Sequence, residues 1–141
     1  MKSIIRLEEM CVLATAADDI PHCSLMAYVS AEDCSRIHLI THKKTKKYSN
    51  FINNPSVSLL IDTRSSAPQG SRRNVKALTV NGTVAVVEDA ATANVLRQEF
   101  ITRHSHLREF AEDEDAVVVE VTIQSLQLLR GATDATYATI K

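Results

Sequence analysis

The hydrophobic period of the chain changes abruptly near residue 42, and this change constrains the fold more than any other feature. From Arg36 to Thr41, polar and apolar residues alternate, which is typical of a half-buried strand. A few residues later, Tyr48, Phe51 and Ile52 fall on one face of a helix. Pro55 then ends the helix, because proline disfavours helical backbone in the residue before it. The segment therefore predicts a strand, a short corner and a helix.

Short apolar segments that predict further strands make up much of the remaining chain. They are Cys11–Ala16, Cys23–Ser30, Val57–Asp62, Val75–Val87 and Ala116–Val121, the last with room to extend to Leu129. Asn81-Gly82 interrupts the longest of them, and we expect a β-bulge there, with a hairpin turn as the alternative. Further helices are expected at 4–10, at 90–103 with Asp89 as N-cap, and at 105–110, followed by a tail from Gly131.

The connections between these strands are mostly short, which favours antiparallel pairing. Six antiparallel strands without a sequence repeat predict a small closed barrel, mainly β with peripheral helices. The chain has 141 residues and no linker rich in proline or glycine. We therefore expect a single domain over residues 1–141.

Composition excludes several classes of function. The net charge is −1, so no overall field attracts nucleic acid or anionic lipid. No apolar run approaches the roughly 18 residues of a membrane span, and the first residues do not resemble a signal peptide. Cys11, Cys23 and Cys34 fit neither a disulfide framework nor a metal motif. We expect a cytoplasmic protein with reduced, mostly buried thiols.

The corner between the third predicted strand and its helix is rich in lysine. It reads Thr41-His42-Lys43-Lys44-Thr45-Lys46-Lys47. The start of a helix has unpaired amides and a partial positive charge, which together suit a phosphate group. A solvated basic turn and a nucleic-acid patch are the alternatives, and the corner alone does not separate them.

Flanking segments give the corner a context. They are, in chain order, Val12–Ala16 with the turn at Pro21, Ser24–Val29, Ile37–Thr41, Thr45–Lys47, Asn50–Pro55, Val57–Leu60 and Leu78–Thr83. In the order and spacing of these segments, the chain from about Cys11 to Leu129 resembles the pyridoxamine 5'-phosphate oxidase-like split-barrel flavoproteins.

This resemblance implies a six-stranded antiparallel split β-barrel that binds FMN. It implies that Thr41, Thr45, Lys46 and Lys47 contact the phosphate and ribityl chain. It also implies that the second strand passes the flavin ring, mainly through its backbone. The implied cofactor-binding residues are Ser24, Leu25, Met26, Ala27, Ile40, Thr41, Thr45, Lys46 and Lys47. A homodimer is implied as well, with the flavin site at the subunit interface.

The chain departs from the oxidase itself in three places. Ser24 and Val29 stand where, or close to where, the oxidase has basic residues, so other residues must supply that charge. The candidates are Lys43, Lys44, Arg64, Arg72 and Arg73, and the sequence does not choose among them. No substrate-binding extension follows Gly131. The resemblance is thus to short members of the superfamily, and the substrate is unassigned.

Three functions remain open from the sequence: an FMN-dependent oxidoreductase for a small molecule, a flavin-binding electron carrier without its own substrate, and a haem-binding relative. The loop 63–74 would separate the first two. If it is ordered over the flavin and leaves a cavity, an enzyme is favoured, and if the ring edge is open to solvent, an electron carrier is favoured. For haem, His22, His42 or His104 would supply the ligand. We expect His104 and His106 to be a surface pair, His38 to face solvent or the barrel mouth, and the acidic run 112–115 to be a solvated loop. No residue is singled out as a general acid or base, and no metal is expected.

Overall fold

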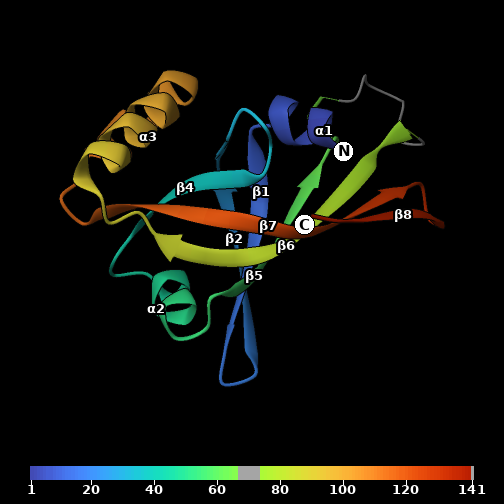
Figure 1. Cartoon of the computed structure of the whole chain (residues 1–141), viewed down its shortest axis with the longest axis horizontal. Coiled ribbons are helices and arrows are strands. Elements are labelled where there is room, and N and C mark those ends of the chain that lie inside the picture. Colours follow the sequence, from blue (N-terminus) through green and yellow to red (C-terminus); the bar gives the residue numbers. More distant parts are fainter. Residues whose placement is uncertain (67–73, 141) are drawn as a thin grey trace.

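The computed structural model describes residues 1–66 and 74–140, and its main feature is one curled antiparallel sheet (Figure 1). Its strands are β1 (Met10–Ala17), β2 (Ile20–Ala27), β3 (Val29–Ser30), β4 (Arg36–His42), β5 (Ser56–Asp62), β6 (Lys76–Val86), β7 (Ala116–Arg130) and β8 (Asp134–Thr139). The helices are α1 (Lys2–Leu7), α2 (Lys46–Asn53), α3 (Ala90–Arg103), the 3₁₀ turn η2 (Ser105–Leu107) and α4 (Arg108–Glu112).

The strand order explains why the sheet curls. Neighbours run β2-β1-β5-β6-β7-β4-β3, and β8 also pairs with β7. The two end strands, β2 and β3, follow one another in the chain with only Tyr28 between them. The chain therefore joins both ends of the sheet at Tyr28, which bends it into a split barrel.

The predicted fold class is confirmed, but the described residues form eight strands where six were expected. The predicted strand Cys23–Ser30 is divided at Tyr28, and the tail after Gly131 returns as β8 along β7. The predicted helix 4–10 ends at Leu7, because β1 already begins at Met10.

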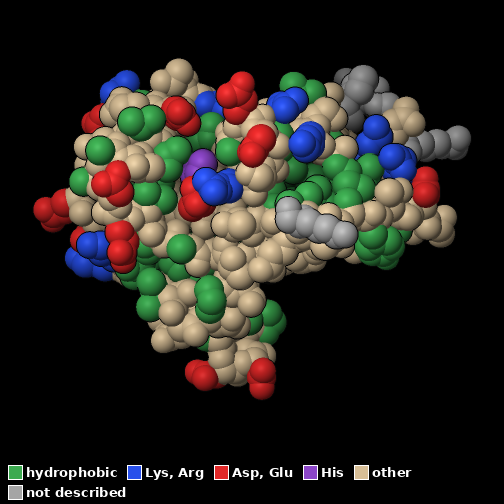
Figure 2. Space-filling view, in the orientation of Figure 1, with side chains coloured by type: hydrophobic (Ala, Val, Ile, Leu, Met, Phe, Trp, Pro, Cys, Tyr) green, Lys and Arg blue, Asp and Glu red, His purple; other side chains and the backbone are tan. Residues whose placement is uncertain are grey.

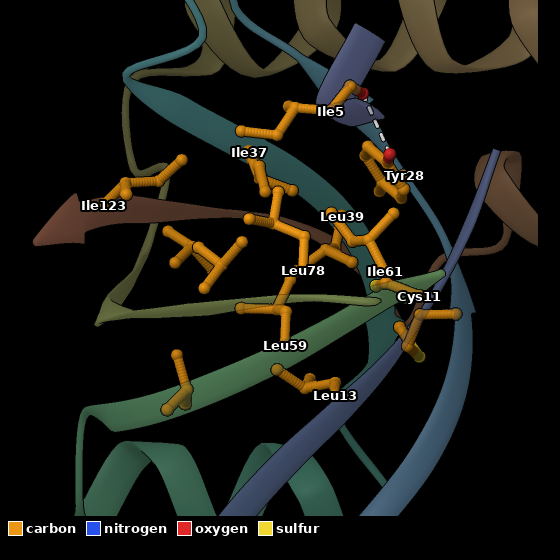
Figure 3. Close-up of a cluster of buried hydrophobic side chains, with 14 of the residues drawn as sticks. Ile5, Cys11, Leu13, Tyr28, Ile37, Leu39, Leu59, Ile61, Leu78 and Ile123 are labelled. Atoms are coloured by element: carbon orange, nitrogen blue, oxygen red, sulfur yellow. Dashed lines mark hydrogen bonds between the residues drawn. The ribbon is translucent and has the colours of Figure 1, made fainter. Parts of the chain in front are cut away.

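The barrel core consists mainly of aliphatic side chains from the inward-facing positions of the strands. Figure 3 shows Leu13, Leu59 and Leu78 meeting across three neighbouring strands. At the upper end of this view, the Tyr28 hydroxyl donates a hydrogen bond of 2.8 Å to the Ile5 carbonyl. α1 is thereby fixed to the residue that closes the sheet.

The long strand β6 contains the expected bulge. Its register with β7 shifts between Asn81 and Gly82, so the hairpin alternative is wrong. At Gly82 an added Cβ would collide with the carbonyl oxygen of Thr122 on β7, which is why glycine is required here.

Charged side chains are unevenly distributed over the surface. Figure 2 shows that the face over β6 and β7 is largely uncharged, and that acidic side chains lie at the tip of the β1–β2 hairpin. In the part of the chain that the structure describes, no helix combines the length and apolar character needed to cross a membrane.

Candidate functional site

The corner between β4 and α2 is a compact, internally bonded turn. The Thr45 amide and the Thr45 hydroxyl both donate to the His42 carbonyl, at 3.2 and 2.8 Å. The same hydroxyl accepts a hydrogen bond of 3.4 Å from the Tyr48 amide, so Thr45 is the N-cap of α2. The strand, corner and helix predicted from the sequence are therefore confirmed.

Thr41 lies beneath this corner and is almost completely buried. Its hydroxyl is 3.3 Å from that of Thr45. Because the Thr45 proton is already donated to His42, Thr41 is the donor in this pair. Both hydroxyl groups thus fix the shape of the corner, and an approaching anion would first meet the lysines and the helix amides.

The first turn of α2 presents those groups. The amides of Lys46 and Lys47 lie in the first turn of α2, where backbone amides have no carbonyl acceptor within the helix. The Lys46 side chain is exposed, whereas that of Lys47 is half-buried, and this burial lowers the pKa of its ammonium group. No carboxylate among residues 1–66 and 74–140 pairs with either lysine. Burial removes part of the hydration of the Lys47 ammonium group, and an anion bound here would compensate for that loss.

The other predicted phosphate-binding residues differ in their availability. The Lys44 ammonium lies 3.3 Å from an Asp115 carboxylate oxygen, whereas Lys43 is exposed and has no ion pair among the described residues. Arg64 follows the end of β5 that is remote from α2 and pairs with Asp62 at 3.0 Å. Arg72 and Arg73 lie outside the described residues, as does most of the loop 63–74.

β2 supplies an open strand edge beside the corner. Among the strands that the structure describes, β2 pairs only with β1, and the Tyr28 amide that follows it donates to the Glu9 carbonyl on that same side. Because successive backbone amides alternate in direction, those of Leu25 and Ala27 point to the open edge. The Leu25 side chain is 71% exposed, whereas that of Met26 is buried in the core.

The structure brings the predicted residues of β2 and β4 together. Ala27 and Ile40 belong to one buried cluster with Ile101 of α3 and Val118 of β7. Two buried polar side chains, Asn50 and Thr15, connect α2 to β1. The buried cluster joins β2 to β4, and the hydrogen bond joins α2 to β1, the neighbour of β2.

The histidines are largely occupied in structural roles. His104 is fully buried and its Nε2 donates to the Tyr28 carbonyl at 2.9 Å, so the expected surface pair is wrong for His104 and right only for His106. His38 is buried, with Nε2 2.9 Å from a Glu120 carboxylate oxygen. His42 Nε2 donates to the Phe110 carbonyl at 3.1 Å. The signal that could have indicated the burial of His104 is its spacing of four residues from Phe100, whose buried ring it contacts.

The thiols offer no reactive site in the barrel. Cys11 and Cys34 are buried as expected, and burial raises the pKa of Cys11 to about 12. Cys23 differs from the expectation, because its place on the outer face of β2 leaves it exposed. Among the residues described, no three His, Cys, Asp or Glu side chains gather as metal ligands would.

Comparison with known proteins decides the family. Residues 1–130 match the family model described as pyridoxamine 5'-phosphate oxidase. The chain belongs to the pyridoxamine 5'-phosphate oxidase family. This membership confirms the resemblance inferred from the flanking segments of the lysine-rich corner. No curated protein sequence matches the chain significantly.

Solved structures with this fold include proteins described by different cofactors. An FAD-binding protein from Mesorhizobium loti is 18% identical, with a TM-score of 0.73 over 90% of this chain and 89% of that one. A haem storage protein from Vibrio cholerae is 16% identical, with a TM-score of 0.75 over 92% and 91%.

A haem-binding protein from Mycobacterium smegmatis is 15% identical, with a TM-score of 0.79 over 93% of this chain. The chain spans only 52% of that protein. At such identities the likeness to all three shows a shared fold, and the choice of cofactor depends on this chain's own residues.

Proposed function

We propose that this member of the pyridoxamine 5'-phosphate oxidase family binds FMN, with the phosphate at the start of α2 and the ring along the open edge of β2. The observation that carries the proposal is Lys47, a half-buried ammonium group with no carboxylate partner among the described residues. Lys47 belongs to the first turn of α2, where the amides of Lys46 and Lys47 have no acceptor within the helix. A phosphate monoester supplies both the charge and the acceptor oxygens that this arrangement lacks.

The remaining predicted residues then have distinct tasks. The amides of Leu25 and Ala27 offer hydrogen-bond donors to the polar edge of a flavin, and Thr41 and Thr45 hold the corner in place. The apolar pair Ala27 and Ile40 excludes water from the region behind that strand edge. When bound, the isoalloxazine ring supplies hydride or electron transfer. The proposed activity is that of an oxidoreductase acting on a small molecule of unassigned identity.

We further propose a homodimer that completes the site. A row of paired residues crosses the outer face of the sheet in the order Leu25, Val12, Leu60, Thr79, Gln127 and Tyr137. None of these side chains is charged, and Leu25 and Tyr137 are 71% and 72% exposed. Such a face is suited to pack against the same face of a second copy of the chain. Since Leu25 is one of the proposed flavin-binding residues, the second copy would border the flavin.

Haem is the second candidate, and it is favoured by the two haem proteins that share the fold. Of the three histidines considered as iron ligands, His104 and His42 already use Nε2 in hydrogen bonds to carbonyl groups. His22, half-buried on β2, is therefore the residue that would bind iron.

An absorption spectrum separates the two candidates. The purified protein is reconstituted with FMN and, in a second sample, with haem, and unbound cofactor is removed by gel filtration. We expect flavin bands that persist through the column and elution at the size of a dimer. A Soret band that survives the column and disappears in His22→Ala would instead support haem. A protein that retains neither cofactor would overturn both candidates.

A further inference from the structure

The corner that precedes α2 is bonded to a segment far along the chain, which runs from the second half of α4 to the residue before β7. The His42 ring stacks on the Phe110 ring, with centroids 4.4 Å apart and planes inclined by 13°. His42 Nε2 also donates to the Phe110 carbonyl at 3.1 Å. One residue further, the Lys43 amide donates to the Asp115 carbonyl at 3.0 Å. Two consecutive corner residues are thus bonded to the segment 110–115.

His42 connects this fastening to the start of α2. Its carbonyl accepts hydrogen bonds from both the amide and the hydroxyl of Thr45, the N-cap residue. A shift of His42 would therefore shift Thr45, and with it the first amides of the helix. The His42 ring contacts Phe110 and the His42 carbonyl bonds Thr45, so the position of Phe110 affects the position of the helix start.

We propose that His42 and Phe110 form a positioning pair that sets the affinity of the site for a phosphate group. The inference rests on the proposed FMN function. Neither residue belongs to the pattern Thr41, Thr45, Lys46 and Lys47, and neither needs to touch the phosphate. Their effect is geometric, because charge-assisted hydrogen bonds weaken when their donors are displaced or misaligned.

A positioning role predicts an effect that depends on the phosphate. FMN and riboflavin share the ring and the ribityl chain, and only FMN has the phosphate. Loss of the stacked pair therefore weakens FMN binding, by about tenfold for one displaced charge-assisted contact, and leaves riboflavin binding nearly unchanged. The ratio of the two dissociation constants isolates the corner from the rest of the site.

The chain provides a matched control for loss of an aromatic ring beside a histidine. Phe100 contacts His104 with ring centroids 5.0 Å apart, and it belongs to the buried cluster against which Phe110 packs. Replacing either phenylalanine by leucine keeps an apolar side chain at that position and removes the contact between its aromatic ring and the neighbouring histidine. The histidine in contact with Phe110 belongs to the corner, whereas the histidine in contact with Phe100 does not.

The experiment compares wild type, Phe110→Leu, Phe110→Tyr and Phe100→Leu by titration with FMN and with riboflavin, after thermal melting has shown that each variant is folded. We expect the preference for FMN to fall about tenfold in Phe110→Leu, to return in Phe110→Tyr and to be unchanged in Phe100→Leu. A wild-type preference in Phe110→Leu, or an equal loss in Phe100→Leu, overturns the positioning role alone. A wild-type protein without affinity for FMN overturns the proposed function, and this inference with it.

Discussion

Asn50 on α2 donates a hydrogen bond of 3.1 Å from its side-chain amide to the hydroxyl of Thr15 on β1, and both side chains are at least 95% buried. Thr15 is in turn the register partner of His22 on β2. This single bond therefore couples the helix of the proposed phosphate site to the sheet that carries the proposed ring site. It also leaves both groups dependent on one another, because neither can reach water.

Removing one partner of this pair should destabilise the fold. Asn50→Ala leaves the Thr15 hydroxyl buried without its donor, and we expect a loss of about 1–3 kcal/mol in the free energy of unfolding, measured in urea. The double change Asn50→Leu with Thr15→Val removes both polar groups and should cost less than Asn50→Ala. Asn53→Ala, on the exposed side of the same helix, should stay within about 0.5 kcal/mol. Equal losses for the two alanine variants would show that the buried bond has no special role.

Lys47 should contribute more to FMN affinity than its neighbour Lys44. Lys47→Ala removes a charge-assisted contact worth about 1.5–3 kcal/mol, which corresponds to a ten- to hundredfold increase in Kd. Lys44→Ala should have little effect, because that ammonium already pairs with Asp115 and is 84% exposed. Fluorescence titration measures both values. A larger effect at Lys44 than at Lys47 would show that the phosphate does not bind at Lys47, as we propose, but on the side of the corner where Lys44 lies.

FMN affinity should also depend on pH through Lys47. Burial lowers the pKa of this group in the free protein below the ordinary lysine value of 10.5, whereas a bound phosphate would raise it. Binding therefore takes up protons. FMN affinity is highest at neutral pH, where Lys47 is protonated, and it falls as the pH rises through the lowered pKa of this group. In Lys47→Arg the fall should move to higher pH, because guanidinium stays charged throughout this range. The same pH profile in both proteins would rule out Lys47 as the titrating group.

The bulge in β6 should tolerate no side chain. In Gly82→Ala the new Cβ would collide with a carbonyl oxygen in the neighbouring strand, and we expect a loss of roughly 3 kcal/mol. Gly131→Ala is the comparison, because Gly131 has open space around it and only its φ of 64° is unfavourable for alanine. There we expect a loss of roughly 1 kcal/mol. Thermal unfolding of the two variants in parallel gives the order, and the reverse order would contradict the crowding at Gly82.

The sequence predicted those parts of the fold that have a local signal. The strand before Thr41, the helix start near Thr45, the N-cap at Asp89 and the bulge at Gly82 each depend on residues close together in the chain, and each is confirmed. The strand before Thr41 was expected to be half-buried, and this was wrong, because Ile37 to Thr41 are all buried. β8 was missed because its residues are polar and mostly exposed, so no apolar alternation marks it. It forms because β4 covers only the first half of β7, which leaves the second half free to pair.

The site shows the same division between local and distant signals. The lysine-rich corner was visible because its donors are adjacent in sequence. The stack of His42 on Phe110 joins residues that are 68 positions apart, and the bond of Asn50 to Thr15 joins residues 35 apart. Such contacts depend on how the sheet curls, which no local pattern contains. The division of the predicted second strand at Tyr28 was missed for this reason too.

A titration of the cofactor-free protein with FMN and with riboflavin, followed by flavin fluorescence, is the most direct test of the phosphate site at the start of α2. We expect one FMN per chain and riboflavin binding at least about tenfold weaker, because only FMN offers a phosphate to Lys47 and the first amides of α2. Equal affinity for the two flavins would contradict a phosphate site at this corner, and no binding of either would contradict the proposed function.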